Sequence, residues 1–233
     1  MAIITNDSHN EYLPIKYAEF MNIPVIVYKA FVSDKGRGGN PAGIIFSESP
    51  CSQIVMQSAA RESGFPETVF ITPLEGSRYR LRFFTPRQEV PLCGHATIAA
   101  WTWLSHEKKL TPGCYTQDTE RGPLAIEITE EGEIFMEQPL PFFGAVADEE
   151  KVVASLGFLR EALHPAYPVQ LVSTGLPDIL VPLSDISLLD KIKPDFKKIE
   201  DFCRADNDHD LYIVPCLANS SFLKRYIDDL ENL

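Results

Sequence analysis

A cysteine, a glycine and a histidine stand side by side where the sequence changes from a strand-like to a helix-like pattern. They are Cys93, Gly94 and His95, within the segment from Phe84 to Leu104. The first N–H groups of a helix have no partner inside it and bind anions, and the same end of a helix favours a thiolate. A histidine there can transfer protons near neutral pH. These residues therefore indicate either a proton-transfer site or a tight turn with a buried cysteine and a capping histidine.

Three further positions are candidates for catalysis or for contact with a ligand. Glu67 follows Phe-Pro and enters an apolar strand, where a carboxylate can act as a general acid or base. The alternative for Glu67 is a solvated glutamate at a strand edge. Asn40 lies in a Gly-Gly-Asn-Pro turn, and its amide can bind a substrate or cap the turn. Gly175 ends a predicted strand in Ser-Thr-Gly and can present its backbone N–H to a substrate.

Composition and charge exclude several classes of protein. The 233 residues carry a formal net charge of -12, which argues against a nucleic-acid partner because phosphate binding needs a basic face. No stretch approaches the ~18 apolar residues that span a membrane, so no membrane partner is expected. The five cysteines are widely spaced and form no Cys-x-x-Cys pair, so neither a zinc site nor a disulfide framework is indicated. We expect a reduced, cytoplasmic protein.

The elements that must position these residues follow an α/β pattern. A helix begins after Ser49, which can cap it, and ends at Gly64. The segment 95–107 predicts a second helix, and its many small residues suggest that a sheet packs closely around it. Alternating or apolar runs predict strands at 25–31, 42–46, 67–73 and 79–86.

The pattern restarts after the turn-rich segment 110–114, which is the expected domain boundary. We therefore divide the chain into an appended segment (1–22), a first lobe (23–112) and a second lobe (113–233). The second lobe shows no counterpart of the small-residue helix. Its predicted helices are 148–157 and 195–205, and its predicted strands are 123–129, 133–139, 169–175, 178–183 and 210–216.

Three segments in sequence order resemble the phenazine-biosynthesis PhzF-like family, whose members share the diaminopimelate-epimerase fold. They are "GGNPAGIIF", "SGFPETVFIT" and "FTPRQEVPLCGHATIAA". "QPLPFFG" and "VSTGLPDILVPLSD" look like the second half of the family, and the resemblance covers about residues 23–226. It implies an α/β (α+β) fold of two pseudo-symmetric lobes, each a curled, mostly antiparallel sheet around a central helix.

The resemblance also implies roles for the candidate residues. Glu67 matches the glutamate that acts as acid and base in a cofactor-free proton shift, and His95 and Asn40 match a histidine and an asparagine of the family site. Cys93 stands where related epimerases and racemases carry a cysteine that abstracts the α-proton. No metal and no organic cofactor is expected. Gly94 and Ala96 would contribute backbone N–H groups that hold a substrate carboxylate.

The chain departs from the family at its C-terminal end. The "ANSSFLKRY" segment resembles the approach to a Glu-Asp-Pro-x-Thr-Gly-Ser-type motif that opens a second central helix, but "IDDLENL" follows instead. The second lobe is therefore expected to be incomplete, with uncovered apolar surface and unpaired strand edges. A homodimer formed through that open lobe is the expected assembly.

Three functions remain open from the sequence. The first is an isomerase or epimerase that moves a proton on a small carboxylic acid through Glu67. The second is a racemase-type enzyme that uses Cys93 and needs a second acid or base. The third is a catalytically impaired or inactive ligand-binding or dimerisation module. The substrate itself is not identified by the sequence.

Overall fold

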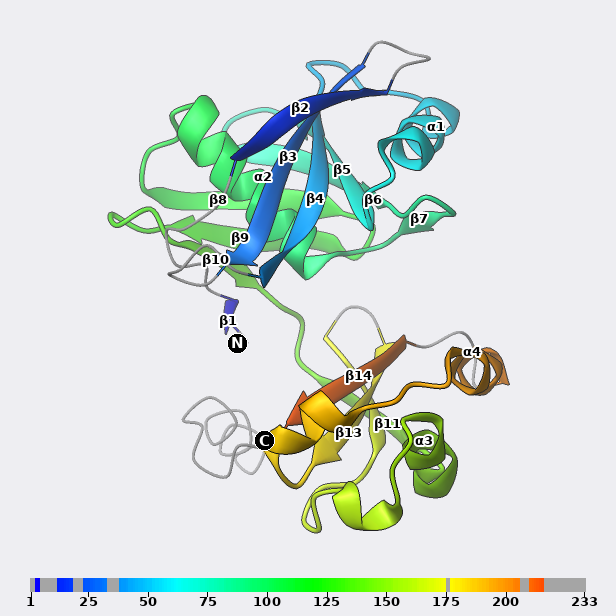
Figure 1. Cartoon of the computed structure of the whole chain (residues 1–233). Coiled ribbons are helices and arrows are strands. Elements are labelled where there is room, and N and C mark those ends of the chain that lie inside the picture. The colour runs from blue at the N-terminus through cyan, green and yellow to red at the C-terminus, as the bar shows by residue number, and fades with distance from the viewer. Residues whose placement is uncertain are drawn as a thin grey trace. The chain divides into compact units, whose positions relative to one another are not determined.

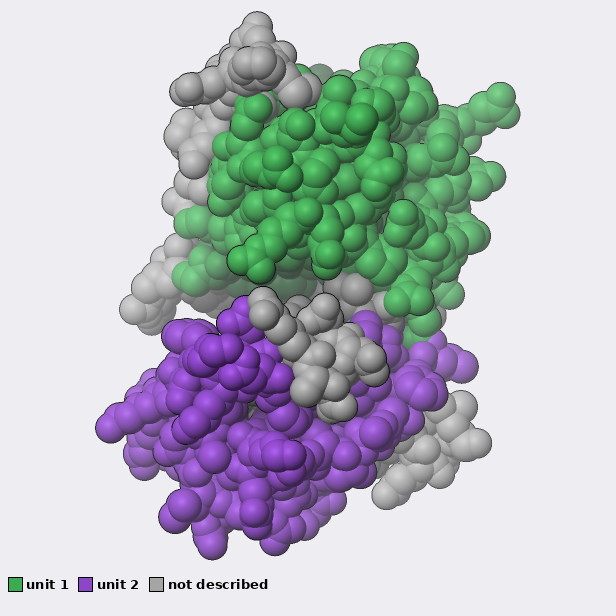
Figure 2. All heavy atoms as spheres, turned by 90° about the vertical axis from the view of Figure 1, so that its right-hand side faces the viewer, with its two compact units in different colours: residues 1–139 green, residues 140–233 purple. Residues whose placement is uncertain are grey.

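The computed structural model describes residues 3–4, 12–18, 23–32, 38–174, 177–205 and 210–215. The chain divides into two compact units, Met1–Pro139 and Leu140–Leu233, which Figure 2 colours separately.

Unit 1 is built on one sheet. Its strands run in the order β1-β10-β9-β8-β6-β5-β4-β3-β2, and β7 pairs with β6 at the side of this path. Two pairs are parallel, β4 with β5 and β6 with β8, and the others are antiparallel. The strands are β1 (Ile3–Ile4), β2 (Tyr12–Ala18), β3 (Ile23–Val32), β4 (Gly38–Phe46), β5 (Glu67–Pro73), β6 (Arg78–Phe84), β7 (Glu89–Val90), β8 (Gly113–Thr119), β9 (Gly122–Ile128) and β10 (Ile134–Glu137).

The sheet curls around helix α2 (Gly94–Glu107), which contacts β3, β4, β5 and β10 (Figure 1). Every residue from Ala96 to Leu104 is buried, so all sides of this helix face protein. Small side chains such as Ala99 let the strands approach closely, and Ile98 packs in the same cluster as Ile44 of β4. The central, buried helix expected from the sequence is confirmed.

A second helix, α1 (Gln53–Ser63), covers the opposite face of the same strands. Side chains alternate along a strand, so Ile44 faces α2 while Ile45 packs with Met56 of α1. The helix is capped by Ser52, whose side chain accepts a hydrogen bond from the N–H of Val55. Ser49 was expected in this role, but the helix begins three residues later.

Unit 2 contains a four-stranded sheet in the order β11-β12-β13-β14, with β13 and β14 parallel. Residues of α3, β13 and α4 share one apolar cluster, so the helices cover one face of this sheet. The elements are β11 (Phe142–Val146), α3 (Glu149–Ser155), the 3₁₀ turn η1 (Arg160–Ala162), β12 (Gln170–Ser173), β13 (Pro177–Leu183), the 3₁₀ turn η2 (Ile186–Lys191), α4 (Phe196–Ala205) and β14 (Asp210–Pro215).

The boundary between the units differs from the expected one. Strands β8, β9 and β10 belong to the sheet of unit 1, so the division falls after Pro139 and not after residue 112. β8 pairs in parallel with β6, and its buried Gln117 accepts a hydrogen bond of 3.1 Å from the indole N–H of Trp101 on α2. The described parts of the segment 1–22, β1 and β2, also pair within this sheet and are not appended to it.

The observed architecture is a mixed α/β fold with a curled sheet around a buried helix, as expected for the first lobe. In the part of the chain that the structure describes, no helix is long and apolar enough to cross a membrane.

Candidate active site

Glu67 is the first residue of β5, and the preceding loop fixes its position. Helix α1 ends at Gly64 with φ of 69°, a left-handed conformation that glycine adopts without steric cost. The hydroxyl groups of Ser63 and Thr68 are hydrogen-bonded at 2.8 Å in a buried position, which closes the short loop between helix and strand. The Glu67 side chain remains 23% exposed, so its carboxylate can reach a ligand.

Cys93 and His95 are held by the start of α2. Cys93 is the N-cap residue, with extended backbone angles of φ -147° and ψ 118°. Thr97 fixes this turn, because its hydroxyl donates a hydrogen bond of 2.7 Å to the carbonyl of Cys93 and its N–H donates another of 3.0 Å. The Cys93 residue is 7% exposed and the His95 side chain 12% exposed, so both lie largely away from water.

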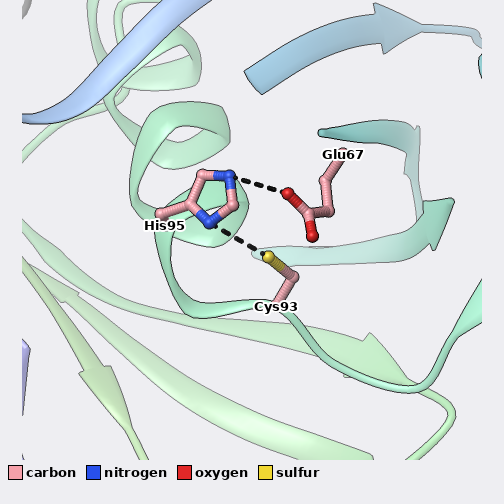
Figure 3. A group of neighbouring side chains, drawn as sticks. All are labelled: Glu67, Cys93 and His95. Carbon is pink, nitrogen blue, oxygen red and sulfur yellow. Dashed lines mark hydrogen bonds and ion pairs between the residues drawn. The ribbon is translucent and has the colours of Figure 1, made fainter. Parts of the chain in front are cut away.

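These elements bring Glu67, Cys93 and His95 together (Figure 3). The imidazole of His95 stands between the other two side chains, with one nitrogen directed at each. Its Nε2 lies 3.2 Å from Oε2 of Glu67, and its Nδ1 lies 3.4 Å from Sγ of Cys93. Within the described residues, Nε2 is buried and has no hydrogen-bond partner of suitable geometry, so its contact with Glu67 is an ion pair.

The surroundings of His95 change its protonation. Burial alone lowers the pKa of its imidazole, but the hydrogen bond with Cys93 and the close contact with the Glu67 carboxylate outweigh burial and raise the pKa from 6.5 to about 9. His95 is therefore an imidazolium at neutral pH, with N–H groups that can donate toward both neighbours. The sequence indicated only that a histidine at this position can transfer protons near neutral pH, and the raised pKa means that it does so from the protonated form.

Of the four remaining candidate residues, the structure describes Gly94, Ala96 and Asn40. Gly94 and Ala96 belong to the first turn of α2, where backbone N–H groups have no acceptor inside the helix. Asn40 lies on β4, two residues before Ala42, which pairs with Glu67. Within the described residues Asn40 makes no hydrogen bond to the three clustered side chains. Gly175 lies outside the described residues.

The sequence identified Glu67, Cys93 and His95 as candidates but did not predict that their side chains are in direct contact. His95 was expected to orient a substrate, whereas its two nitrogens contact Glu67 and Cys93. Thr97, which fixes the carbonyl of Cys93, was not singled out. A threonine four residues after an N-cap position is a signal that could have identified it, because its hydroxyl can donate a hydrogen bond to the i−4 carbonyl.

The fold and the cluster together define an α/β protein with acid–base side chains gathered at the start of an enclosed helix. The sequence profile of the family described as "Phenazine biosynthesis-like protein" matches residues 28–227. This chain belongs to that family.

Individual relatives agree with this assignment. The chain is 36% identical over 179 residues to "Uncharacterized isomerase YfhB" of Bacillus subtilis, covering 75% of this chain and 61% of that protein. It is 32% identical over 191 residues to "Uncharacterized isomerase CA_C3446" of Clostridium acetobutylicum, covering 78% and 63%. The crystal structure of the Bacillus anthracis phenazine biosynthesis protein, PhzF family, matches with a TM-score of 0.72 and 30% identity over 83% of this chain and 66% of that one. The chain thus spans less than two thirds of the length of these relatives.

Proposed function

We propose that this protein is an isomerase that moves a proton on a small carboxylic acid, with Glu67 as the acid and base. The observation that carries the proposal is the contact of Glu67 with His95, which holds a carboxylate and an imidazolium 3.2 Å apart at the start of a buried helix. The names of the relatives as isomerases support the class of reaction.

In the proposed mechanism the ionised Glu67 takes a proton from a carbon activated by the substrate's carboxylate or by a conjugated double bond. The negative charge that develops on the substrate is stabilised by the imidazolium of His95 and by the N–H groups of Gly94 and Ala96. Glu67 then returns the proton to another carbon. Asn40, on the strand that pairs with β5, orients the substrate in this mechanism.

The arrangement favours double-bond migration over inversion of a stereocentre. Inversion without a cofactor needs two acid–base groups on opposite faces of one carbon. The ligand atoms of Glu67, Cys93 and His95 all lie within 4.8 Å of one another and therefore address a substrate from one side. A proton taken and returned by the same carboxylate stays on one face of the substrate, which is the stereochemistry of a suprafacial double-bond shift.

Hydrogen exchange tests the proposal without knowledge of the true substrate. A panel of small hydroxy and unsaturated carboxylic acids is incubated with the protein in D₂O, and loss of C–H signals is followed by proton NMR. For an acid that exchanges, Glu67→Gln should slow the exchange about 10²- to 10⁴-fold, as expected for loss of a general acid–base. Asn40→Ala should mainly raise the concentration of acid at which the exchange rate reaches half of its maximum. Unchanged exchange in Glu67→Gln contradicts the assigned role.

A racemase-type mechanism through Cys93 is the second candidate, favoured by the 3.4 Å contact between its sulfur and the His95 imidazolium. The same exchange experiment separates the two. Loss of exchange in Cys93→Ser, with exchange retained in Glu67→Gln, would transfer the role of base to the thiol.

The third candidate is a ligand-binding or dimerisation module without catalysis. Binding of a panel acid, detected by line broadening without any exchange, would favour it. We also propose that the protein is cytoplasmic, on the basis of its widely spaced cysteines, and that it forms a homodimer. The dimer is supported by the apolar side chains that Phe142 and Val146 expose on β11, an edge strand of the described sheet of unit 2. Sedimentation that gives the mass of one chain at micromolar concentration would contradict the dimer.

A further inference from the structure

The three clustered side chains offer a second kind of chemistry. A thiolate, an imidazole and a carboxylate are the donors that zinc and similar divalent transition metals prefer in proteins, whereas magnesium and calcium prefer oxygen alone. Cys93, His95 and Glu67 supply one donor of each kind, with all three atoms within 4.8 Å of one another. We propose that they bind a divalent transition-metal ion of the zinc class, which acts as an inhibitor.

The spacing of Cys93 and His95 suits a common metal ion. In tetrahedral zinc sites the Zn–S and Zn–N bonds of about 2.3 and 2.0 Å place the two ligand atoms about 3.5 Å apart. The Sγ of Cys93 and the Nδ1 of His95 are 3.4 Å apart. An ion placed between them therefore needs little movement of either residue, and both are fixed by the first turn of α2.

Glu67 completes the site from the neighbouring strand. Its carboxylate contacts Nε2 of His95, whereas Cys93 contacts Nδ1, and a carboxylate oxygen lies within 4.8 Å of the sulfur, so a rotation of the Glu67 side chain toward Nδ1 makes it the third ligand. The side chain is 23% exposed and sits at the first position of β5, which leaves room for that rotation. Three protein ligands leave a fourth position open for water or a ligand carboxylate, as in catalytic zinc sites.

The spacing of the three ligands in the sequence does not match a common zinc-binding motif. The widely spaced cysteines indicated no zinc centre because no Cys-x-x-Cys pair occurs. The ligands come instead from a Cys-x-His at a helix start and from a glutamate 26 residues before the cysteine, and only the fold brings them together.

Inhibition follows because the metal takes the groups that the reaction needs, a consequence that rests on the proposed function. Bound Glu67 can no longer accept a proton, and bound His95 can no longer serve as a cationic donor to the substrate. The metal-loaded protein should therefore show no hydrogen exchange on the acid panel, and a chelator should restore the exchange fully.

Cobalt(II) is the probe for the site itself, because a thiolate bound to Co²⁺ produces a strong near-ultraviolet charge-transfer absorption. Titration of the reduced protein should give this band with saturation at one ion per chain, and Zn²⁺ should abolish it by displacement, since zinc binds such sites more tightly than cobalt. Cys93→Ser should abolish the band. Glu67→Ala should weaken cobalt binding by at least about tenfold, the lower end of the loss known for outer-shell partners of a metal site.

Cys114→Ser is the matched control, because this exposed cysteine also lies in unit 1 but outside the cluster. It should retain the full band. Both tryptophans lie on α2, so an unchanged emission spectrum shows that Cys93→Ser has kept the helix in place.

A band that survives in Cys93→Ser, or no band in the wild-type protein, overturns the proposal. Exchange activity that persists in the zinc-loaded protein overturns the inhibitory role. If the protein exchanges no panel acid but binds cobalt through Cys93, the proposed function has failed while the metal site is confirmed.

Discussion

The two units of this chain cover their sheets differently. In unit 1 the sheet has α2 packed on one face and α1 on the other, whereas in unit 2 one apolar cluster joins the sheet to α3 and α4. Among the described residues, most large apolar side chains that remain exposed belong to unit 2. They are Leu140, Phe142, Phe143, Val146, Leu159, Ile186 and Phe196, against Phe31 and Ile54 in unit 1.

Ion pairs of the two units also differ in how far they are exposed to water. In unit 1, the ion pairs of Glu67 with His95 and of Arg82 with Glu89 are largely withdrawn from water. In unit 2, Arg160 pairs with Glu149 while its own side chain is 69% exposed. Electrostatic interactions strengthen as water is excluded, so these two shielded pairs of unit 1 interact more strongly than the exposed Arg160–Glu149 pair of unit 2. Candidate catalytic groups therefore gather where the enclosed helix begins.

The prediction with the largest expected effect concerns the packing of the enclosed helix α2. Ile98→Ala removes a fully buried side chain from α2 and should lower the free energy of unfolding by about 2–5 kcal/mol, since the surrounding strands can fill the cavity only in part. Phe196→Ala, at an exposed position of α4, should change it by no more than about 0.5 kcal/mol. Urea unfolding followed by far-ultraviolet circular dichroism measures both. Equal costs would contradict the difference in burial between these two positions.

Local sequence patterns were sufficient for the elements that carry the site. Glu67 opens a strand, and Cys93 precedes a buried helix, as their flanking apolar and small residues indicated. Strand β8 was missed because its one buried side chain is the polar Gln117, so no apolar alternation marks it. That omission placed the domain boundary too early, since the long-range pairing of β8 with β6 is what joins the hairpin of β8 and β9 to the strands before it.

The contacts within the site were beyond local patterns. Glu67 is brought to α2 because β4 and β5 pair in parallel beside the enclosed helix, and pairing between distant strands is not encoded in either strand alone. The raised pKa of His95 depends on this contact with Glu67 as well as on the local hydrogen bond with Cys93. A sequence pattern names such residues, but their protonation depends on neighbours that only the fold supplies.

The second prediction concerns pH. Because folding raises the pKa of His95 from 6.5 to about 9, the folded protein binds the proton more tightly than the unfolded chain. This contribution is fully present below about pH 6.5 and is lost as the pH rises through about 9, with an upper limit of about 3 kcal/mol. The free energy of unfolding of the wild-type protein should therefore fall, relative to that of His95→Gln, across this range.

Urea unfolding at a series of pH values, followed by tryptophan emission, measures this difference in unit 1. His106→Gln, which removes a histidine near the other end of α2, is the matched control for loss of an imidazole. Parallel pH profiles for the wild type and His95→Gln would show that the cluster does not hold its proton as described.

The prediction with the smallest expected effect compares the stabilisation by one ion pair from each unit. Arg82 donates two hydrogen bonds to Glu89, of 2.6 and 2.5 Å, and the Glu89 side chain is only 8% exposed. Glu89→Gln should therefore cost about 1–2 kcal/mol, because it leaves the half-buried Arg82 without its counter-charge. Glu149→Gln, which breaks the pair with Arg160 at the surface of unit 2, should cost less than about 1 kcal/mol.

Double-mutant cycles that pair each glutamine variant with Arg82→Gln or Arg160→Gln measure the two coupling energies directly. Because surface pairs are screened by salt and shielded pairs much less so, raising the ionic strength to about 1 M should remove most of the Arg160–Glu149 coupling and leave most of the Arg82–Glu89 coupling. If both couplings vanished together in salt, the charges of unit 1 would be as accessible to solvent as those of unit 2, and the electrostatic distinction between the units would fail.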